Sequence, residues 1–298
     1  MQTHRDKLVV VNADDFGFSP AITNGILRAH REGIVTSAAV TTNMPSAADA
    51  VARLAEAPSL GVGVHLNICQ GPPLSKPGRR LAGGDGLLNL SAVRAVLTCA
   101  TRPRLIAAVE AEFDAQIRRL LDWGVRPTHL DSHRHIHAFG PVFARVLRLA
   151  RRYDVPAVRR CVEVLPGGGW PPAEPRQAGV SRAVSACFRF GEVLAGHAPE
   201  CVCRGVWGIA HTGRIDADWL LAAAGRIGTG PREIMTHPSA SVGSARESRL
   251  GESRRRELEA LCEPRVRQAF ENNGIRLVHY GQITDGTDTA AATDHRRR

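Results

Sequence analysis

The stretch LVVVNAD, from Leu8 to Asp14, is a short apolar run that ends where two consecutive aspartates, Asp14 and Asp15, begin. A run of this length and composition is typical of a buried β-strand. The next residues predict a helix, because Ser19 suits the N-cap, Pro20 suits the first turn and Gly33 suits the C-terminal stop. A buried strand followed by a helix is the repeating unit of an α/β fold.

The same alternation continues along the chain. Further strands are predicted at residues 35–42, 60–68, 127–133, 157–164, 202–209, 232–237 and 275–281. Helices are predicted at residues 46–58, 104–124, 140–155 and 252–272. Eight strand candidates with helices between them indicate a parallel sheet with crossover helices. We therefore expect a single-domain α/β protein with a distorted, TIM-like (β/α) barrel over residues 1–284, with an open doubly wound sheet as the alternative.

Three segments do not fit the alternation. A Gly- and Pro-rich loop is expected at residues 71–89, and the segment LPGGGWPPAEPRQAG, residues 165–179, is expected to be a flexible insert. Residues 285–298 are polar and aperiodic, so we expect a disordered tail there.

The composition excludes several protein classes. No stretch approaches the roughly 18 apolar residues of a membrane span, and the N-terminus has no signal-peptide core, so a cytoplasmic protein is expected. Of the 39 basic residues only Lys7 and Lys76 are lysines, and the arginines that make the net charge +10 are scattered, with no nucleic-acid-binding motif. We therefore expect a small-molecule substrate rather than nucleic acid, and a homodimer stays open.

The seven cysteines predict neither a disulfide framework nor a zinc knuckle, because they are widely spaced. Cys201 and Cys203 lie one residue apart on a predicted strand, where their side chains would point to opposite faces. Buried, reduced thiols are expected.

Polar residues follow several of the predicted strands at their carboxyl ends. They are Asp14 and Asp15 after the first strand, His65 in the third, Asp131 and His133 in the fourth, and His237 in the seventh. In parallel barrels these strand ends converge on one mouth, which carries the active site. We therefore expect these carboxylates and imidazoles to meet, although a lone Asp-Asp pair or strand-end histidine is more often a turn or a satisfied polar residue.

The segment THLDSHRHIH, Thr128 to His137, places four histidines and one aspartate in ten residues. Short histidine-rich tracts often bind metal, but a catalytic zinc takes only three protein ligands. The strand is expected to end near Ser132, so the histidines beyond His133 are expected to orient ligands, line the cleft or face away.

Two histidines and one carboxylate form a three-ligand metal site with an open position for water. The ion would lower the pKa of that water, a second carboxylate could take its proton, and a further histidine could protonate a leaving group. This set of residues indicates metal-assisted hydrolysis of an amide or an ester.

The motifs VNADDFG, GIVTSAAVT, GVGVHLNICQGPPLS, RPTHLDSHRHIH and IMTHPS resemble, in order and spacing, those of the YdjC-type carbohydrate deacetylases, which include the chitooligosaccharide deacetylases. The resemblance implies a distorted barrel and N-deacetylation of an acetylated amino sugar. It also implies that Asp15, His65 and His133 hold one divalent ion. Asp14 would then be the general base and His237 the general acid. The family is described with Mg²⁺, whereas the ligand chemistry suits Zn²⁺ better, so the ion stays open.

The substrate stays open as well. The segment GVWGIAHTGRIDADWLL followed by REIMTHP resembles a branch of the family linked to hopanoid biosynthesis, which implies a lipid-linked N-acetylglucosamine as an alternative substrate. A metal-dependent phosphoesterase and a non-catalytic sugar-binding protein are the remaining alternatives. Asp131, His135 and His137 are candidates for orienting ligands or contacting substrate. Trp170 and Trp207 are candidates for stacking on a sugar ring, with core packing as the equal alternative.

Overall fold

The computed structural model describes residues 6–102, 104–168, 170–196, 198–242 and 250–283. Within these residues the strands form one parallel sheet in the order β4-β3-β2-β1-β6-β5, and β7 also pairs with β1. The strands are β1 (Lys7–Phe16), β2 (Ser37–Val40), β3 (Gly61–Leu66), β4 (Leu130–Ser132), β5 (Val206–Trp207), β6 (Gly230–Thr236) and β7 (Ile275–Leu277).

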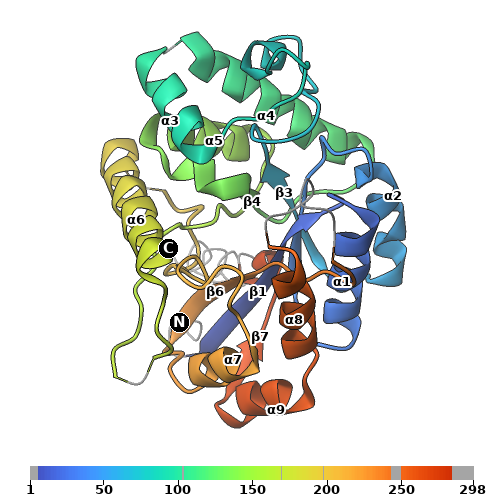
Figure 1. The fold of residues 1–298 in the computed structure, drawn as a ribbon, viewed down its shortest axis with the longest axis vertical. Helices are drawn as coiled ribbons and strands as arrows, with labels where there is room; N and C mark the ends of the chain where they lie inside the picture. Colours follow the sequence, from blue (N-terminus) through green and yellow to red (C-terminus); the bar gives the residue numbers. More distant parts are fainter. Residues whose placement is uncertain (1–5, 103, 169, 197, 243–249, 284–298) are drawn as a thin grey trace, which may run out of the picture.

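Helices surround this sheet (Figure 1). The α-helices are α1 (Pro20–Arg31), α2 (Ala47–Ala52), α3 (Ala92–Thr101), α4 (Arg104–Asp122), α5 (Gly140–Arg152), α6 (Pro175–Ala195), α7 (Ala217–Ala224), α8 (Glu252–Leu261) and α9 (Pro264–Asn272). The 3₁₀ helices are η1 (Arg53–Glu56), η2 (Gly78–Leu81) and η3 (His133–Ala138). None of the described helices combines the length and apolar character needed to cross a membrane.

The segment from Ala157 to Val162 connects the two edges of the curled sheet. The backbone amide of Leu130 in β4 donates to the carbonyl of Ala157, and the amide of Arg159 donates back to Leu130. On the other side the amide of Val206 in β5 donates to the carbonyl of Val162. The predicted α/β fold with a distorted barrel is therefore confirmed.

One of the eight predicted strands is wrong. The structure has only an isolated bridge, Leu130 to Val158, where a strand over residues 157–164 was expected. The amide of Val162 donates to the carbonyl of Arg160 only two residues earlier, and this tight turn ends the extended backbone. Cys201 and Cys203 also lie outside any strand, because β5 begins only at Val206. The cysteines are free as expected, but the expectation that they are all buried is wrong, because Cys187 is exposed and Cys201 is half-buried.

Two further predictions, one of a helix and one of a flexible insert, are corrected as well. The predicted helix over residues 252–272 is divided into α8 and α9, because Pro264 has no amide hydrogen to continue the α8 ladder. The insert expected to be flexible at residues 165–179 runs into α6, which begins at Pro175. The predicted disordered tail, residues 285–298, lies outside the described residues.

Strand β1 forms the centre of the core. Every residue from Leu8 to Phe16 is buried, as expected for a parallel strand covered on both faces. Full burial of a valine such as Val9 or Val11 stabilises the fold by roughly 1.5–3 kcal/mol. The chain then enters α1 where predicted, with the Ser19 side chain accepting a hydrogen bond from the amide of Ile22. This packing holds the carboxyl end of β1 in place.

Glycine at position 63 allows β3 to pack against the histidine at the start of the histidine-rich segment. A Cβ atom on Gly63 would lie 2.4 Å from Cε1 of His129, whose ring is stacked on Tyr280 with centroids 4.3 Å apart. We expect Gly63→Ala to lower the free energy of unfolding by about 1–3 kcal/mol, because the core must shift to accept it. Urea denaturation measures this loss.

The control is Gly179→Ala in α6, where an added Cβ would meet nothing within 4 Å. It should be neutral or stabilise the protein by about 0.5–1 kcal/mol. Equal stability of the Gly63→Ala variant and the wild type would contradict the close packing of His129.

Candidate active site

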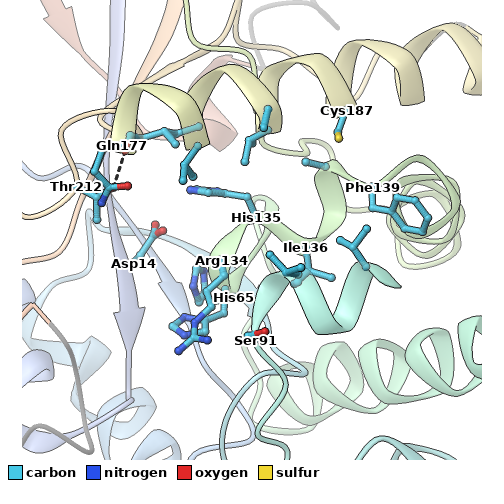
Figure 2. Close-up of a pocket in the computed structure, with 18 of the residues that line it drawn as sticks. Asp14, His65, Ser91, Arg134, His135, Ile136, Phe139, Gln177, Cys187 and Thr212 are labelled. Atoms are coloured by element: carbon cyan, nitrogen blue, oxygen red, sulfur yellow. Dashed lines mark hydrogen bonds between the residues drawn. The ribbon is translucent and has the colours of Figure 1, made fainter. Parts of the chain in front are cut away.

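The carboxyl ends of β1, β3, β4 and β6 deliver the predicted site residues to one cavity. Its volume is about 890 Å³, and its lining includes Asp14, Asp15, His65, His133 and His237. Figure 2 shows Asp14 and His65 at one end of this space, with His135 and Arg134 beside them. Strands that are far apart in the sequence thus bring together five of the residues that were predicted to meet.

The backbone at the end of β1 explains how two consecutive aspartates reach the same cavity. Successive side chains in a strand normally point to opposite faces. Asp15, however, has a φ of 70°, and the register between β1 and β2 shifts between Ala13 and Phe16. A left-handed conformation at a residue other than glycine costs of order 1–3 kcal/mol and is held by the surrounding structure. It turns both carboxylates toward the cavity.

The four histidines of Thr128–His137 have different positions. His129 is buried in the core, and His133 follows β4 directly and lines the cavity. Arg134 and His135 both have a φ of 56°, so the chain turns sharply after β4 and His135 also faces the cavity. His137 is buried between Ser132, whose hydroxyl lies 2.5 Å from Nδ1, and the Arg159 carbonyl, 3.1 Å from Nε2. The predicted end of the strand at Ser132 is confirmed.

Asp15, His65 and His133 form the group with a geometry suited to a metal ion. Their candidate ligand atoms lie within 4.8 Å of one another. Oδ1 of Asp15 is 3.1 Å from Nδ1 of His133 and 3.5 Å from Nε2 of His65. The other oxygen of Asp15 pairs with Arg254, which leaves Oδ1 directed at the two imidazoles. One carboxylate and two imidazoles fit a divalent ion with an open coordination position.

Asp131 fixes the orientation of His65. Its Oδ1 lies 2.7 Å from Nδ1 of His65, so Nδ1 donates to the carboxylate and Nε2 faces Asp15. Burial by itself would lower the pKa of His65, but the charges of Asp131 and Asp14 outweigh it and raise this pKa to about 9. A carboxylate behind a histidine in this way is the usual arrangement around a metal-binding imidazole. Asp131 therefore lies where a residue that orients a ligand would be expected.

A second group, Asp14, His65 and Asp131, is equally compact but is already in contact with a cation of the protein. The Arg159 guanidinium lies 2.6 Å from Oδ1 of Asp14 and 2.9 Å from Oδ2 of Asp131. It also contacts Glu233 at 2.7 Å, and all of these side chains are buried. A cation is not needed where Arg159 already supplies the charge, so this group does not fit a second ion.

Arg159 also controls the charge of Asp14. Burial favours the protonated form of Asp14, but the positive charges of Arg159 and His65 and the hydrogen bonds from Arg159 hold its pKa far below the usual range. Both oxygens accept from Arg159, at 2.6 and 2.8 Å, and Asn12 donates to Oδ1 at 3.0 Å. Asp14 is thus an ionised carboxylate in a fixed orientation.

His237 lies on the other side of Asp14. Its Nε2 is 3.9 Å from Oδ2 of Asp14, and its backbone amide donates to Glu257 at 2.7 Å. Burial lowers the pKa of His237 to about 4, despite the opposing charge of Asp14. This favours the neutral imidazole near neutral pH, so a general acid at this position would first have to take up a proton.

The two tryptophans proposed as sugar-stacking residues have other partners. Trp170 and Trp207 contact each other with ring centroids 5.2 Å apart, and Trp170 also packs on Trp219 and His211. The Arg232 guanidinium lies over the Trp207 ring at 4.5 Å. Neither tryptophan is part of the cavity lining, which favours core packing, and a sugar contact stays a prediction.

Several site residues were not predicted from the sequence. Arg159 is the most important, and Arg254 and Gln70 also line or support the site, with Gln70 Oε1 3.0 Å from Nε2 of His133. The sequence held one signal for Arg159, its position inside an apolar run. An arginine that is buried in such a run requires carboxylate partners. The distant positions of Asp14, Asp131 and Glu233 in the sequence gave no sign that they share it.

Beyond these groups the cavity lining is mostly apolar, although Ser91, Gln177 and Thr212 also belong to it. Its far part is lined by Val93, Val96 and Leu97 of α3 and by Val180, Ala183 and Val184 of α6. In Figure 2, Cys187 on α6 and Phe139 beyond η3 lie at the end opposite Asp14. The site thus combines a charged end with a long apolar part.

Comparison with known proteins places the chain among relatives. A carbohydrate deacetylase of Brevibacillus brevis is 41% identical over 152 residues, which cover 50% of this chain and 57% of that protein, less than two thirds of its length. A chitooligosaccharide deacetylase of an Enterobacter species is 32% identical over 276 residues, covering 91% of this chain and 97% of that protein.

The fold has a counterpart among solved structures. A crystal structure from Enterococcus faecalis, of a protein provisionally assigned to cellobiose-phosphate cleavage, superposes with a TM-score of 0.74 at 24% identity. The match covers 94% of this chain and 99% of that one, and it supports the fold described above. The family model described as YdjC-like protein matches residues 8–272. This match includes every residue of the site, and the chain belongs to the YdjC-like protein family.

Proposed function

We propose that the protein is a metal-dependent deacetylase that hydrolyses the acetamide group of an N-acetylated amino sugar. The observation that carries this proposal is the meeting of Asp14, Asp15, His65, His133 and His237 at one end of a cavity that is large enough for a sugar. The names of the relatives, carbohydrate deacetylase and chitooligosaccharide deacetylase, support the same reaction and substrate class.

Asp15, His65 and His133 would hold the ion. When bound, a divalent cation at this position polarises the acetyl carbonyl and lowers the pKa of a water molecule. Two imidazoles favour Zn²⁺, whereas Mg²⁺ prefers oxygen ligands. Arg254 keeps one oxygen of Asp15 occupied, so this carboxylate would bind the ion through Oδ1.

Asp14 would accept the proton of the attacking water. Arg159 keeps the carboxylate ionised and fixes its direction, so that it faces the reacting group without rearranging. The same contact makes Asp14 a weak base, and the proton would therefore pass on. His237 is the nearest imidazole on that side, 3.9 Å from Oδ2 of Asp14.

His237 would then deliver a proton to the departing amine. It is neutral at rest, so it can take the proton that Asp14 accepts and release it as the C–N bond breaks. The products are acetate and the free amino sugar. The proton thus passes only between groups of the site. This agrees with the burial of Asp14 and His237, which keeps most water away from them.

The apolar part of the cavity supports a second candidate substrate, an N-acetylated amino sugar linked to a lipid. Apart from Gln177, the side chains of α3 and α6 that line the cavity offer a sugar hydroxyl no hydrogen-bonding partner of comparable strength, and they suit an apolar aglycone. A phosphoesterase with two ions is less well supported, because Arg159 takes the place of a second cation.

The experiment is incubation of the protein, loaded with Zn²⁺ or with Mg²⁺, with di-N-acetylchitobiose and with an alkyl N-acetylglucosaminide. Released acetate and the deacetylated product are followed by mass spectrometry. Acetate from either substrate supports the proposal, and a preference for the alkyl glycoside supports the lipid-linked alternative. Binding of both sugars without acetate release under either ion would show a sugar-binding protein instead. Release of phosphate from phosphate monoesters would favour the phosphoesterase.

Measurements of ion binding should distinguish the ligand His133 from the other histidines of η3. His133→Ala should lose the ion, because it removes one of three ligands, and His65→Ala should do the same. His135→Ala is the matched control, since it also faces the cavity but is outside the ligand group. Asp131→Asn should weaken binding by roughly 10–100-fold, because Asp131 orients His65 without being one of the three ligands.

The measurement is elemental analysis after dialysis, together with calorimetric titration of the metal-free protein. Loss of the ion from His135→Ala with retention in His133→Ala would mean that the wrong histidine has been assigned as the ligand.

A further inference from the structure

Exposed large apolar side chains are concentrated on α3 and α6. The exposed fractions are 68% for Val93 and 57% for Leu97 on α3, and 64%, 80% and 65% for Phe190, Val193 and Leu194 on α6. Valine, leucine and phenylalanine at such exposure are normally scattered singly over a protein surface. We refer to these five residues and Val180 as the α3–α6 face.

This face is continuous with the mouth of the cavity. Val93, Leu97 and Val180 line the cavity and are also exposed. In α6 the apolar positions 180, 183, 187, 190 and 194 follow each other at steps of three and four residues, which places them on one side of the helix. Figure 1 shows α6 on the opposite side of the molecule from α1 and α2. The apolar surface thus extends from the cavity along the outside of α6.

The charges on these two helices are almost all positive. Arg94 on α3 and Arg176, Arg182 and Arg189 on α6 are exposed, and no ion pair is found for any of them within the described residues. The sequence of α3 contains no acidic residue, and that of α6 contains only Glu192, which pairs with Arg160 at 2.6 Å. Unpaired arginines therefore accompany the exposed apolar side chains.

We propose that the α3–α6 face binds the surface of an anionic lipid bilayer. Apolar side chains enter the headgroup region and arginines attract anionic headgroups, and together these are the features of a surface-bound protein. A second copy of the chain is a poorer occupant, because an isologous contact would place the arginines of both copies against each other. The cavity mouth would then face the lipid. The inference goes beyond the proposed function and does not depend on the reaction.

The test is flotation of the full-length protein with phosphatidylcholine vesicles and with vesicles of phosphatidylcholine and phosphatidylglycerol in equal parts. We expect binding to the anionic vesicles only, and loss of binding near 1 M salt, where the Debye length is about 3 Å. The variant R182Q/R189Q should bind about 25-fold more weakly, since each arginine near an anionic surface contributes about fivefold. Phe190→Ser together with Val193→Ser should also weaken binding.

The matched control is R126Q/R256Q, which removes two exposed arginines outside α3 and α6, one in the loop before β4 and one on α8. It should bind like the wild type. None of the substituted residues lines the cavity, so hydrolysis of a soluble substrate should be unchanged in every variant and reports correct folding. Binding that is absent, or that is equally weakened in the control, would overturn the proposal. A dimer in free solution that R182Q/R189Q or the Phe190 and Val193 variant converts to a monomer would identify a second copy as the occupant instead.

Discussion

Replacing Asp14 with asparagine is expected to lower turnover by about 10²–10⁴-fold, the usual effect of losing one general acid or base. Asparagine has nearly the same shape but cannot accept the proton of the attacking water. Its amide group would also face the Arg159 guanidinium, which now donates to both oxygens of Asp14. The ion should stay bound, because Asp14 is outside the group formed by Asp15, His65 and His133.

Kinetics on a soluble N-acetylated sugar, with metal content measured on the same samples, tests this expectation. Asp114→Asn is the matched control, because Asp114 is a largely buried carboxylate on α4 that accepts a hydrogen bond from Tyr153 and lies outside the cavity. It should leave turnover unchanged. Wild-type turnover in Asp14→Asn would exclude Asp14 as the base. Loss of the ion in this variant would instead show that Asp14 takes part in metal binding.

Replacing Arg159 with methionine is expected to lower the free energy of unfolding by about 3–5 kcal/mol, the usual cost of breaking a buried ion pair by removing one partner. Asp14, Asp131 and Glu233 would be left around a buried site without their shared cation. Arg159→Lys should recover only part of this loss, because an ammonium group cannot bind several carboxylates in the fork geometry of a guanidinium.

The neighbouring arginine gives the control. Arg160 pairs with Glu192 at 2.6 Å nearer the surface, with 28% of its side chain exposed, so Arg160→Met should cost only about 0–1 kcal/mol. Urea denaturation of the three variants measures the difference. Equal losses for Arg159→Met and Arg160→Met would contradict a central role for Arg159 in the fold.

The loss in free energy of unfolding caused by Arg159→Met should become smaller as the pH is lowered. In the wild type the pKa of Asp14 is lowered below its ordinary value of 3.8, so the folded state gains stability from this group above that pH. The gain is lost as the pH falls further toward the pKa of the folded state. Without Arg159 the lowering disappears, and the difference between the wild type and the variant should therefore shrink as the pH is reduced below about 4. A difference that does not change with pH would mean that lost packing, rather than charge, causes the destabilisation.

The regular part of the fold could be predicted from local sequence patterns. The apolar run at Leu8, the β-branched run near Val35 and the caps of α1 act over a few residues, and the structure confirms them. The predicted strand at residues 157–164 is wrong, because its apolar pattern does not reveal the tight turn at Val162. The predicted helix over residues 252–272 did not take into account the proline at position 264.

Part of the site could also be predicted, because its residues lie at the ends of the predicted strands. Carboxylates and histidines at the carboxyl ends of parallel strands must meet if the strands are parallel neighbours, and the motif resemblance pointed to the same residues. Their roles as ligands, base and acid remain proposals. The positions of the four histidines could be predicted only up to the end of the strand at Ser132. Beyond it, the left-handed backbone at Arg134 and His135 ends the alternation of side chains that a strand would impose.

The sequence by itself determined the α/β class, the strands that carry the polar residues and the family, because these depend on periodicity, end residues and motif order. Only the tertiary structure decided that Arg159 holds Asp14, Asp131 and Glu233 together and that Trp170 and Trp207 pack against each other outside the cavity. It also decided that burial lowers the pKa of His237 and that the cavity opens between the exposed apolar faces of α3 and α6. The physical reason is that charge pairing and burial depend on distances in space between residues far apart in the sequence, 145 positions for Asp14 and Arg159 and 239 for Asp15 and Arg254, and no local pattern encodes those distances.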